Sequence, residues 1–271
     1  MSNILINIKG LESQELPKGI TPLQIMQEIK GISGDSVICK VDGQLTDLSA
    51  ELLNDCELQF MDAKSKDGHS VLLHSTAHLM AQAVKRLFPK TKVTIGPFLE
   101  NRFYYDFDVK TPFTEEDLAK IEEEMLKISN ENLEITHDII AREEAIKFFE
   151  NIDENYKVEI INDLDKDETL KVYSQGEFTD LCRGPHVPST GQIKHFKLLS
   201  SSATYWRGDE KNQTLQRVYG TSFQNSKDLK KYLLMLEEQK KRDHRKIGKE
   251  LDLFFFDDEV GPGLPLWTPS G

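Results

Sequence analysis

The sequence predicts an α+β fold with more than one domain, and three observations support this prediction. Its 271 residues are enough for one large domain or two smaller ones. A hydrophobic content of 38% beside a charged content of 30% is typical of globular proteins rather than disordered or fibrous ones. Short β-branched stretches and amphipathic helical stretches occur together along the chain, separated by Gly and Pro turns.

Residues 1–62 are predicted to form a small mixed module. Thr21, with Gln24 three positions later, has the pattern of a capping box at the start of a short helix. Asp42-Gly43 is a two-residue hairpin signal directly after a strand-like stretch. One helix among several strands in so short a segment indicates a β-grasp-like module. Strands are expected at 3–8, 37–41 and 58–61.

Residues 63–224 are predicted to form a larger α+β domain with a hydrophobic core of its own. The polar residues 64–68 are expected to be a linker, and the first helix is expected at 70–88. Thr114 and Asp117 have the spacing of a capping pair for a second helix. Another helix is expected at 141–150, with strands at 169–173, 192–199 and 215–219.

Residues 225–249 are predicted to form a long helix that begins at Ser226. Its apolar face extends to about Ile247, and Gly248 is expected to end it. Residues 250–271 are too short and too rich in Gly and Pro to fold alone. We expect them to be the truncated start of a further domain, either disordered or dependent on borrowed contacts.

Charge is distributed unevenly along the chain, whose formal net charge is −12. Residues 113–170 contain 19 acidic and six basic side chains, whereas residues 226–250 contain nine basic and five acidic ones. Such runs are usually solvated helix faces. A segregated basic stretch also suits the phosphates of a nucleic acid, even in an acidic protein.

The sequence indicates a cytoplasmic protein without a membrane partner. Its apolar runs are far too short to cross a bilayer, and its N-terminus does not resemble a secretory signal. Cys39, Cys56 and Cys182 form no paired framework, which favours a reducing compartment. The sequence has no Walker, Rossmann or Gly-x-Ser-x-Gly motif, so a self-contained nucleotide-driven activity is not expected.

Two motifs that combine imidazoles with a thiol are the sharpest chemical feature. His74 and His78 lie four positions apart in a predicted helix, so both project from one face. Cys182 and His186 are also four positions apart, in a Gly-Pro turn. These residues could be ligands of zinc, or a metal-free hydrolytic pocket with imidazoles as general acids or bases. They could also be a structural histidine pair and an inert cysteine, and the residues leave all three alternatives open.

Five neighbouring residues could contribute to a substrate site. Asp180 could hold an ammonium or a hydroxyl group. Lys157, alone among many carboxylates, is more typical of a surface ion pair. Gly96 indicates either an ordinary turn or a close approach of the backbone to a ligand. Tyr104 and Tyr105 alternate in a predicted strand, so one of them is expected in the core.

Two groups of residues could face RNA. Trp206 and Arg207 offer an aromatic ring and a guanidinium for stacking on bases, although Trp206 could equally belong to the core. The predicted third helix carries a basic patch suited to phosphates: Lys240, Lys241, Arg242, Arg245 and Lys246.

Seven motifs, taken in order along the chain, resemble those of bacterial-type threonyl-tRNA synthetases. They are HSTAHL from His74, TIGPF from Thr94, FYYD from Phe103, DLCRGPH from Asp180, YWRGD from Tyr205, LQRVYGT from Leu215 and KRDHRKIGK from Lys241. By this resemblance, residues 1–62 correspond to the TGS domain and 63–224 to a two-layer editing domain. Residues 225–249 correspond to the linker helix and 250–271 to the start of the class II catalytic domain.

The resemblance implies a site that hydrolyses seryl-tRNA(Thr), and it places Lys157 at the family's catalytic lysine. The implied catalytic residues are His74, His78, Lys157, Cys182 and His186, and the implied substrate-binding residues are Gly96, Tyr104, Tyr105, Asp180 and Arg183. Editing is expected to need no metal or cofactor. The resemblance assigns ATP, Mg²⁺ and Zn²⁺ to the catalytic domain of the whole enzyme, which it implies to be a homodimer, so aminoacylation by this chain is not expected.

Two alternatives remain at this stage. A zinc-dependent hydrolase acting on small molecules would not need the basic third helix. A non-catalytic module that binds tRNA would not need the His/Cys motifs. The role of residues 1–62 is also open, between guiding tRNA and bracing the editing domain.

Overall fold

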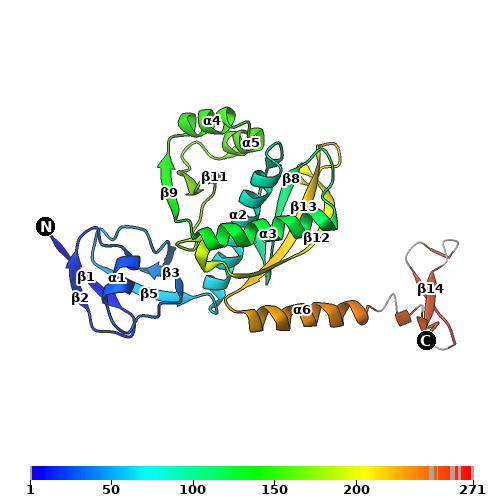
Figure 1. The fold of residues 1–271 in the computed structure, drawn as a ribbon, viewed down its shortest axis with the longest axis horizontal. Coiled ribbons are helices and arrows are strands. Elements are labelled where there is room, and N and C mark those ends of the chain that lie inside the picture. Colours follow the sequence, from blue (N-terminus) through cyan, green and yellow to red (C-terminus); the bar gives the residue numbers. More distant parts are fainter. Residues whose placement is uncertain (1, 244–246, 249, 257–259, 262–263, 270–271) are drawn as a thin grey trace. The chain divides into compact units, whose positions relative to one another are not determined.

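The computed structural model describes residues 2–243, 247–248, 250–256, 260–261 and 264–269. The chain divides into two compact units, residues 1–225 and residues 226–271, and each is described by itself (Figure 1). Among the described residues, no helix is both long enough and apolar enough to cross a membrane.

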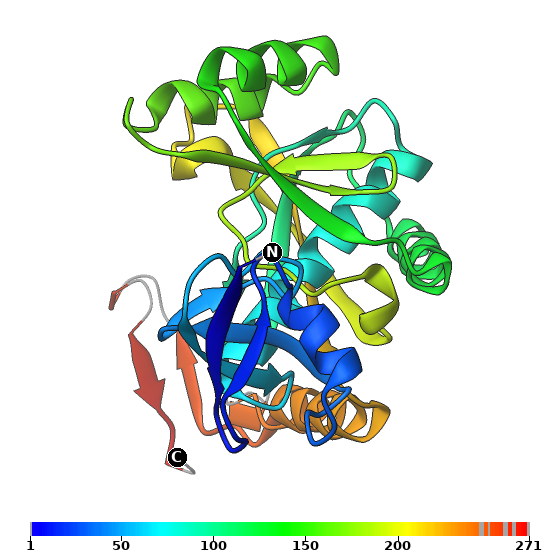
Figure 2. The same cartoon turned by 90° about the vertical axis from the view of Figure 1, so that its left-hand side faces the viewer.

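The first module is a five-stranded sheet with one helix, α1 (Pro22–Glu28). The strand order is β2-β1-β5-β3-β4, and the central pair β1 and β5 is parallel while its neighbours are antiparallel. This is the arrangement expected of a β-grasp-like module, and Figure 2 shows α1 against the sheet. The strands are β1 (Asn3–Ile8), β2 (Gln14–Pro17), β3 (Ser36–Val41), β4 (Gln44–Thr46) and β5 (Cys56–Asp62).

Local signals in this module act as predicted. Thr21 caps α1, and its capping box with Gln24 is complete. Asp42 and Gly43 both have positive φ, 48° and 81°, as a tight two-residue hairpin requires. Ile25 of α1 is fully buried with Ile6 of β1, so the helix covers the apolar face of the sheet.

The larger domain contains a five-stranded sheet covered by two helices, α2 (Lys66–Leu87) and α3 (Glu115–Glu131). The strand order is β12-β13-β8-β6, with β7 also paired to β8. Phe103, Tyr105 and Phe107 of β8 are fully buried beneath α2 and α3. The strands are β6 (Lys92–Val93), β7 (Phe98–Leu99), β8 (Arg102–Asp108), β12 (His195–Tyr205) and β13 (Thr214–Phe223).

A second, three-stranded antiparallel sheet belongs to the same domain. Its order is β11-β10-β9, formed by β9 (Ile135–Ile140), β10 (Leu170–Gln175) and β11 (Phe178–Leu181). Helices α4 (Arg142–Asn151) and α5 (Asn155–Asp163) lie beside it (Figure 1) and share a small core with β10. The predicted α+β class is therefore confirmed.

Several local predictions need correction. Residues 64–68 are not a linker, because Ser65 caps α2 through the Gly68 N–H and the helix begins at Lys66. The strand expected from residue 192 begins at His195, because Thr190–Gln192 forms a 3₁₀ turn. The 3₁₀ turn Trp206–Gly208 follows β12. Helix α5 and strand β9 were not predicted.

The second unit begins with α6 (Ser226–Lys241). The helix ends well before the expected Ile247, and Gly248 is itself helical rather than a stop. A Cβ at Gly248 would lie 2.3 Å from the Phe254 ring, so this glycine serves close packing. The segment expected to be disordered or to borrow contacts forms an antiparallel pair of its own, β14 (Phe254–Phe256) and β15 (Pro265–Trp267).

Candidate active site

Helix α2 supplies two imidazoles to the site. His74 and His78 are one turn apart on a helix that is buried along most of its length, and their ring centroids are 5.1 Å apart. His78 is buried, whereas His74 is half-buried and so is partly exposed to solvent. The turn that follows β11 brings Cys182 and His186 against them.

The two motifs converge into one cluster, defined here as His74, His78, Cys182 and His186. The Cys182 sulfur lies 3.2 Å from Nε2 of His74 and 3.3 Å from Nε2 of His186. The candidate ligand atoms of all four residues lie within 4.8 Å of one another. The structure thus brings the two motifs together, as a zinc site and a metal-free hydrolytic pocket both require.

Hydrogen bonds connect Ser75 to the cluster. The Ser75 hydroxyl accepts the Val187 N–H at 3.0 Å and can donate to Nδ1 of His186 at 3.0 Å. In the tautomer in which Ser75 donates to Nδ1, Nε2 of His186 carries the proton and donates to the Cys182 sulfur, which also accepts the Gly184 N–H at 3.3 Å. In that tautomer the thiol can donate its proton to Nε2 of His74.

Burial keeps this cluster uncharged. It lowers the pKa of His74 to about 3 and that of His78 to about 4, and it also lowers the pKa of His186, each against a usual value of 6.5. Burial raises the pKa of Cys182 to about 12, although the Gly184 N–H opposes this shift. Near pH 7 the cluster is therefore three neutral imidazoles and a thiol, not a thiolate–imidazolium pair.

A buried ion pair lies beside the cluster. Lys157 of α5 is 2% exposed and pairs with Asp180 of β11, which is 1% exposed. The Lys157 ammonium also donates to the Thr94 carbonyl at 2.6 Å and to the Tyr105 hydroxyl at 3.0 Å. Tyr105 in turn donates to Asp180 at 2.6 Å. The interpretation of Lys157 as a surface ion pair is therefore wrong.

The ion pair and the cluster meet at Asp180 and His78. Nδ1 of His78 lies 3.7 Å from a carboxylate oxygen of Asp180. Burial is the largest single effect on the pKa of Asp180 and would raise it. The Lys157 charge, His78 and the hydrogen bonds from Lys157 and Tyr105 together outweigh burial and hold that pKa below its usual value. The site thus combines one fixed charge pair with neutral donors and acceptors in a water-poor environment.

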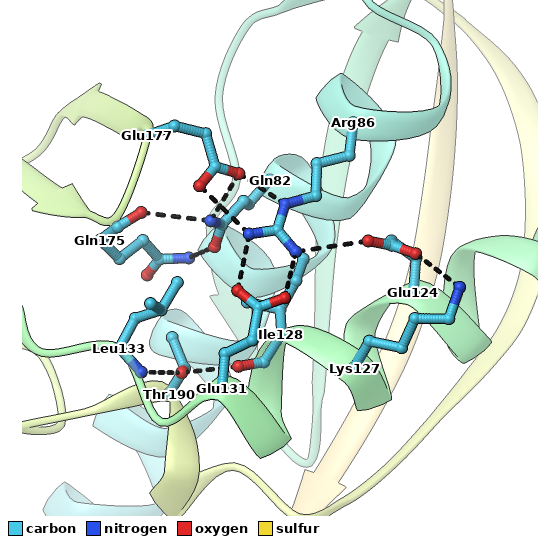
Figure 3. A network of polar contacts seen from close by, with 10 residues as sticks. All are labelled: Gln82, Arg86, Glu124, Lys127, Ile128, Glu131, Leu133, Gln175, Glu177 and Thr190. Carbon is cyan, nitrogen blue, oxygen red and sulfur yellow. Dashed lines mark hydrogen bonds and ion pairs between the residues drawn. The ribbon is translucent and has the colours of Figure 1, made fainter.

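A polar network anchors the hairpin that carries Asp180. Arg86 of α2 binds both oxygens of Glu131 at 2.6 and 2.8 Å and both oxygens of Glu177 at 2.5 and 3.1 Å (Figure 3). Gln82 and Gln175 are also joined by hydrogen bonds there. The β10–β11 turn is therefore tied to the same helix that carries His74 and His78.

The implied substrate-binding residues have different environments. A Cβ at Gly96 would lie 2.2 Å from the Tyr105 ring, so glycine at this position allows the loop before β7 to pack closely against Tyr105 of β8. Tyr105 is buried in the core, which confirms the prediction that one of the two tyrosines would be, and its hydroxyl also contacts the ion pair. Tyr104 lies instead under the Arg217 guanidinium at 3.9 Å. Arg183 is directed outward, with its side chain 79% exposed and paired to Glu168.

The candidate RNA-facing residues are mostly engaged with acidic side chains. Trp206 is buried and its indole N–H donates to Glu159 at 3.0 Å, so it is part of the core. Arg207 pairs with Glu159 and Asp163. On α6, Lys240 lies in the last turn, and Lys241 and Arg242 contact Glu238. Arg245 and Lys246 lie outside the described residues.

Sequence reasoning missed four polar residues that complete the site. Ser75 and Thr94 contact His186 and Lys157, while Tyr173 and Asp47 contact the turn before His186. Ser75 and Thr94 lie within the HSTAHL and TIGPF motifs, but nothing in those motifs singles out their side chains. Asp47 and Tyr173 lie in none of the seven motifs, so only their positions in the fold identify them.

The donor set of the cluster also fits a zinc ion, as three imidazoles and one thiol are typical ligands. In this geometry the Cys182 sulfur contacts Nε2 of His74 and Nε2 of His186 directly, at 3.2 and 3.3 Å.

Comparisons with known proteins relate the chain to tRNA synthetases. A family described as "Threonyl and Alanyl tRNA synthetase second additional domain" matches residues 170–219, which include Asp180, Cys182 and His186. The threonine–tRNA ligase of Pelobacter propionicus is 52% identical over 100% of this chain, which covers 43% of that protein.

Two further threonine–tRNA ligases show the same relationship. That of Symbiobacterium thermophilum is 51% identical over 95% of this chain, and that of Fusobacterium nucleatum is 54% identical over 89%. The chain spans 40% of the length of each. With about half its residues identical to threonine–tRNA ligases over nearly its whole length, the chain belongs to the threonyl-tRNA synthetase family.

Proposed function

We propose that this chain hydrolyses the seryl ester of mischarged tRNA(Thr). The observation that carries the proposal is the Lys157–Asp180 ion pair buried beside a neutral thiol–imidazole cluster. Burying such a charge pair is costly, so it is expected where a reaction or a charged substrate needs it.

The need for such a site follows from the size of the substrates. A synthetic pocket large enough for threonine must admit serine, which lacks one methyl group. A missing methylene contributes only about 1–3 kcal/mol of discrimination, which is too little for accurate translation. A second site that accepts serine and excludes the extra methyl group by crowding removes the error.

The chemistry we propose is attack of water on the ester carbonyl. The bond from the carbonyl carbon to the ribose oxygen breaks, serine leaves as a carboxylate, and the ribose oxygen takes a proton. Lys157 and His74 position the water and relay one of its protons to the ribose oxygen, and its second proton is released as the new carboxyl group ionises. Asp180 holds the seryl ammonium, and the neutral Cys182 thiol shapes the pocket rather than attacking.

Partners and cofactors follow from the same proposal. The substrate is seryl-tRNA(Thr), and the reaction uses no metal or cofactor. Activation of threonine with ATP and Mg²⁺, a zinc site and homodimer formation are proposed for a whole threonyl-tRNA synthetase and not for residues 1–271. A cytoplasmic location is proposed, as protein synthesis requires.

The experiment mixes the chain with tRNA(Thr) carrying labelled serine and follows loss of the ester. The proposal predicts enzyme-dependent hydrolysis that persists after exhaustive chelation. Binding of tRNA without hydrolysis would favour the non-catalytic module. Hydrolysis that stops on chelation and returns with one zinc ion per chain would favour the zinc-dependent hydrolase.

A further inference from the structure

A carboxylate of the first module is buried against the site. Asp47 follows β4 and is 7% exposed, and within residues 2–62 it is the only acidic side chain that is buried. Burying an ionised carboxylate costs several kcal/mol unless hydrogen bonds compensate it. The partners that compensate Asp47 all belong to the larger domain.

Both oxygens of Asp47 accept hydrogen bonds from that domain. Oδ1 accepts the backbone N–H of His186 at 2.8 Å, and Oδ2 accepts the Tyr173 hydroxyl at 2.8 Å. Nδ1 of His137 lies 3.6 Å from Oδ2. These contacts reach strands β9 and β10 and the turn that carries the thiol and imidazole of the cluster.

Tyr173, which is hydrogen-bonded to Asp47, also contacts the rest of the turn. Its ring centroid is 4.5 Å from that of His186, and a Cβ at Gly184 would lie 1.9 Å from its hydroxyl oxygen. Moving Tyr173 therefore disturbs the backbone at Gly184, whose N–H donates to the Cys182 sulfur. One carboxylate thus fixes the turn both directly, at His186, and through the tyrosine, at Gly184.

We propose that Asp47 is a positioning residue of the hydrolytic site: the first module holds residues 182–186 in the geometry that brings Cys182 and His186 to His74. The effect on hydrolysis rests on the function proposed above. The inference gives residues 1–62 a defined role in the site, that of a brace.

The test compares variants of the chain of residues 1–271, each of which removes or keeps a different set of hydrogen bonds. Asp47→Ala removes both hydrogen bonds to the larger domain. Asp47→Asn keeps an oxygen for the His186 N–H and offers an amide to the Tyr173 oxygen. Asp55→Ala is the matched control, because Asp55 accepts the Leu5 N–H at 2.8 Å within the first module.

Two readouts are measured on each variant. The first is kcat and KM for hydrolysis of seryl-tRNA(Thr). The second is the rate of Cys182 alkylation by iodoacetamide at pH 8, followed by mass spectrometry, with the buried Cys39 and Cys56 as internal references. The second readout needs no substrate and reports on the environment of the thiol.

Asp47→Ala is expected to lower kcat roughly 10- to 100-fold, because small displacements of catalytic groups have effects of that size. It is also expected to accelerate Cys182 alkylation. Asp47→Asn is expected to recover most of both properties, and Asp55→Ala to resemble the wild-type chain in both.

Equal behaviour of Asp47→Ala and Asp55→Ala in both readouts would overturn the proposal. If the wild-type chain does not hydrolyse seryl-tRNA(Thr), the proposed function fails, and the alkylation rates alone then decide the role of Asp47. If Asp47→Ala does not fold, Tyr173→Phe replaces it. Alkylation at the wild-type rate in Tyr173→Phe would then contradict the proposal.

Discussion

The sulfur of Cys182 lies 3.2 Å from Nε2 of His74, although 108 positions separate the two residues in the chain. The contact joins a helix of one layer to the turn after a strand of another. Because both groups are uncharged near neutral pH, the contact is a thiol–imidazole hydrogen bond and not an activated nucleophile.

Replacing this thiol distinguishes the two possible mechanisms. Cys182→Ser keeps a donor and an acceptor at the same position, so we expect seryl-tRNA(Thr) hydrolysis to fall by less than about tenfold if the thiol only shapes the pocket. A covalent mechanism predicts loss of nearly all activity instead. Single-turnover kinetics measure the difference, and a trapped acyl-enzyme on the wild-type thiol would refute the water mechanism.

Removing the buried cation affects both stability and activity. Lys157→Met leaves the Asp180 carboxylate buried without its ion-pair partner, so we expect a loss of about 3–5 kcal/mol in the free energy of unfolding. The double variant Lys157→Met with Asp180→Asn is expected to recover much of that stability while remaining inactive. Urea unfolding and deacylation assays check the two effects separately, and a double variant no more stable than Lys157→Met would contradict the pairing.

The buried neutral histidines predict how stability depends on pH. Their folded-state pKa values lie below the unfolded value of about 6.5, so the unfolded chain binds more protons as the pH falls. Stability is therefore complete above pH 6.5 and declines toward pH 4. Between pH 6.5 and 5, each fully buried histidine contributes a loss of up to about 2 kcal/mol, and the half-buried His74 contributes less.

Urea midpoints between pH 8 and pH 5 measure this decline. His78→Asn is expected to make the dependence on pH shallower, whereas His195→Gln, outside the cluster, serves as the control and should keep it. A free energy of unfolding that is constant across this range would show that the cluster is not buried in its neutral form.

Removing Arg86 is expected to lower the free energy of unfolding more than removing an exposed cation does. Arg86→Ala leaves Glu124, Glu131 and Glu177 facing one another without the guanidinium that joins them (Figure 3). We expect a loss of about 1–3 kcal/mol, because hydrogen bonds to charged groups have that magnitude. The control Lys127→Ala removes a 67% exposed partner of Glu124 and should cost less than about 1 kcal/mol. Similar melting temperatures for the two variants would argue against the network.

Chelation tests the metal-free arrangement of the cluster. We expect hydrolysis and the urea midpoint to be unchanged after dialysis against a chelator, because the thiol and imidazoles satisfy one another. Elemental analysis before and after dialysis checks whether a metal was removed. Loss of activity together with loss of one zinc ion per chain would favour the zinc-dependent alternative.

Much of the fold could be predicted because its signals are local. The Thr21 and Thr114 capping boxes and the Asp42-Gly43 hairpin depend on residues within a few positions of one another. Helix α5 and strand β9 could not be predicted in this way, although both contain apolar residues. The β9 sequence, ITHDII, does not alternate apolar and polar positions, and α5 has only nine residues in which to show a period.

The site was less accessible to sequence reasoning. The motif residues His74 and Cys182 were visible as chemistry, but the burial of Lys157 depends on how α5 packs against β8 and β11. Trp206 resembles an RNA-stacking residue in sequence yet is buried beside Tyr156. Asp47 is separated from its partner His186 by 139 positions, and no local pattern connects them.

The most direct test of the account compares two esters in one assay. Wild-type chain is mixed with tRNA(Thr) carrying serine or threonine, and the two first-order rates of ester loss are measured under the same conditions. The account predicts hydrolysis of the seryl ester at least about tenfold faster than that of the threonyl ester, because one extra methyl group must be excluded. Equal rates for the two esters would contradict it.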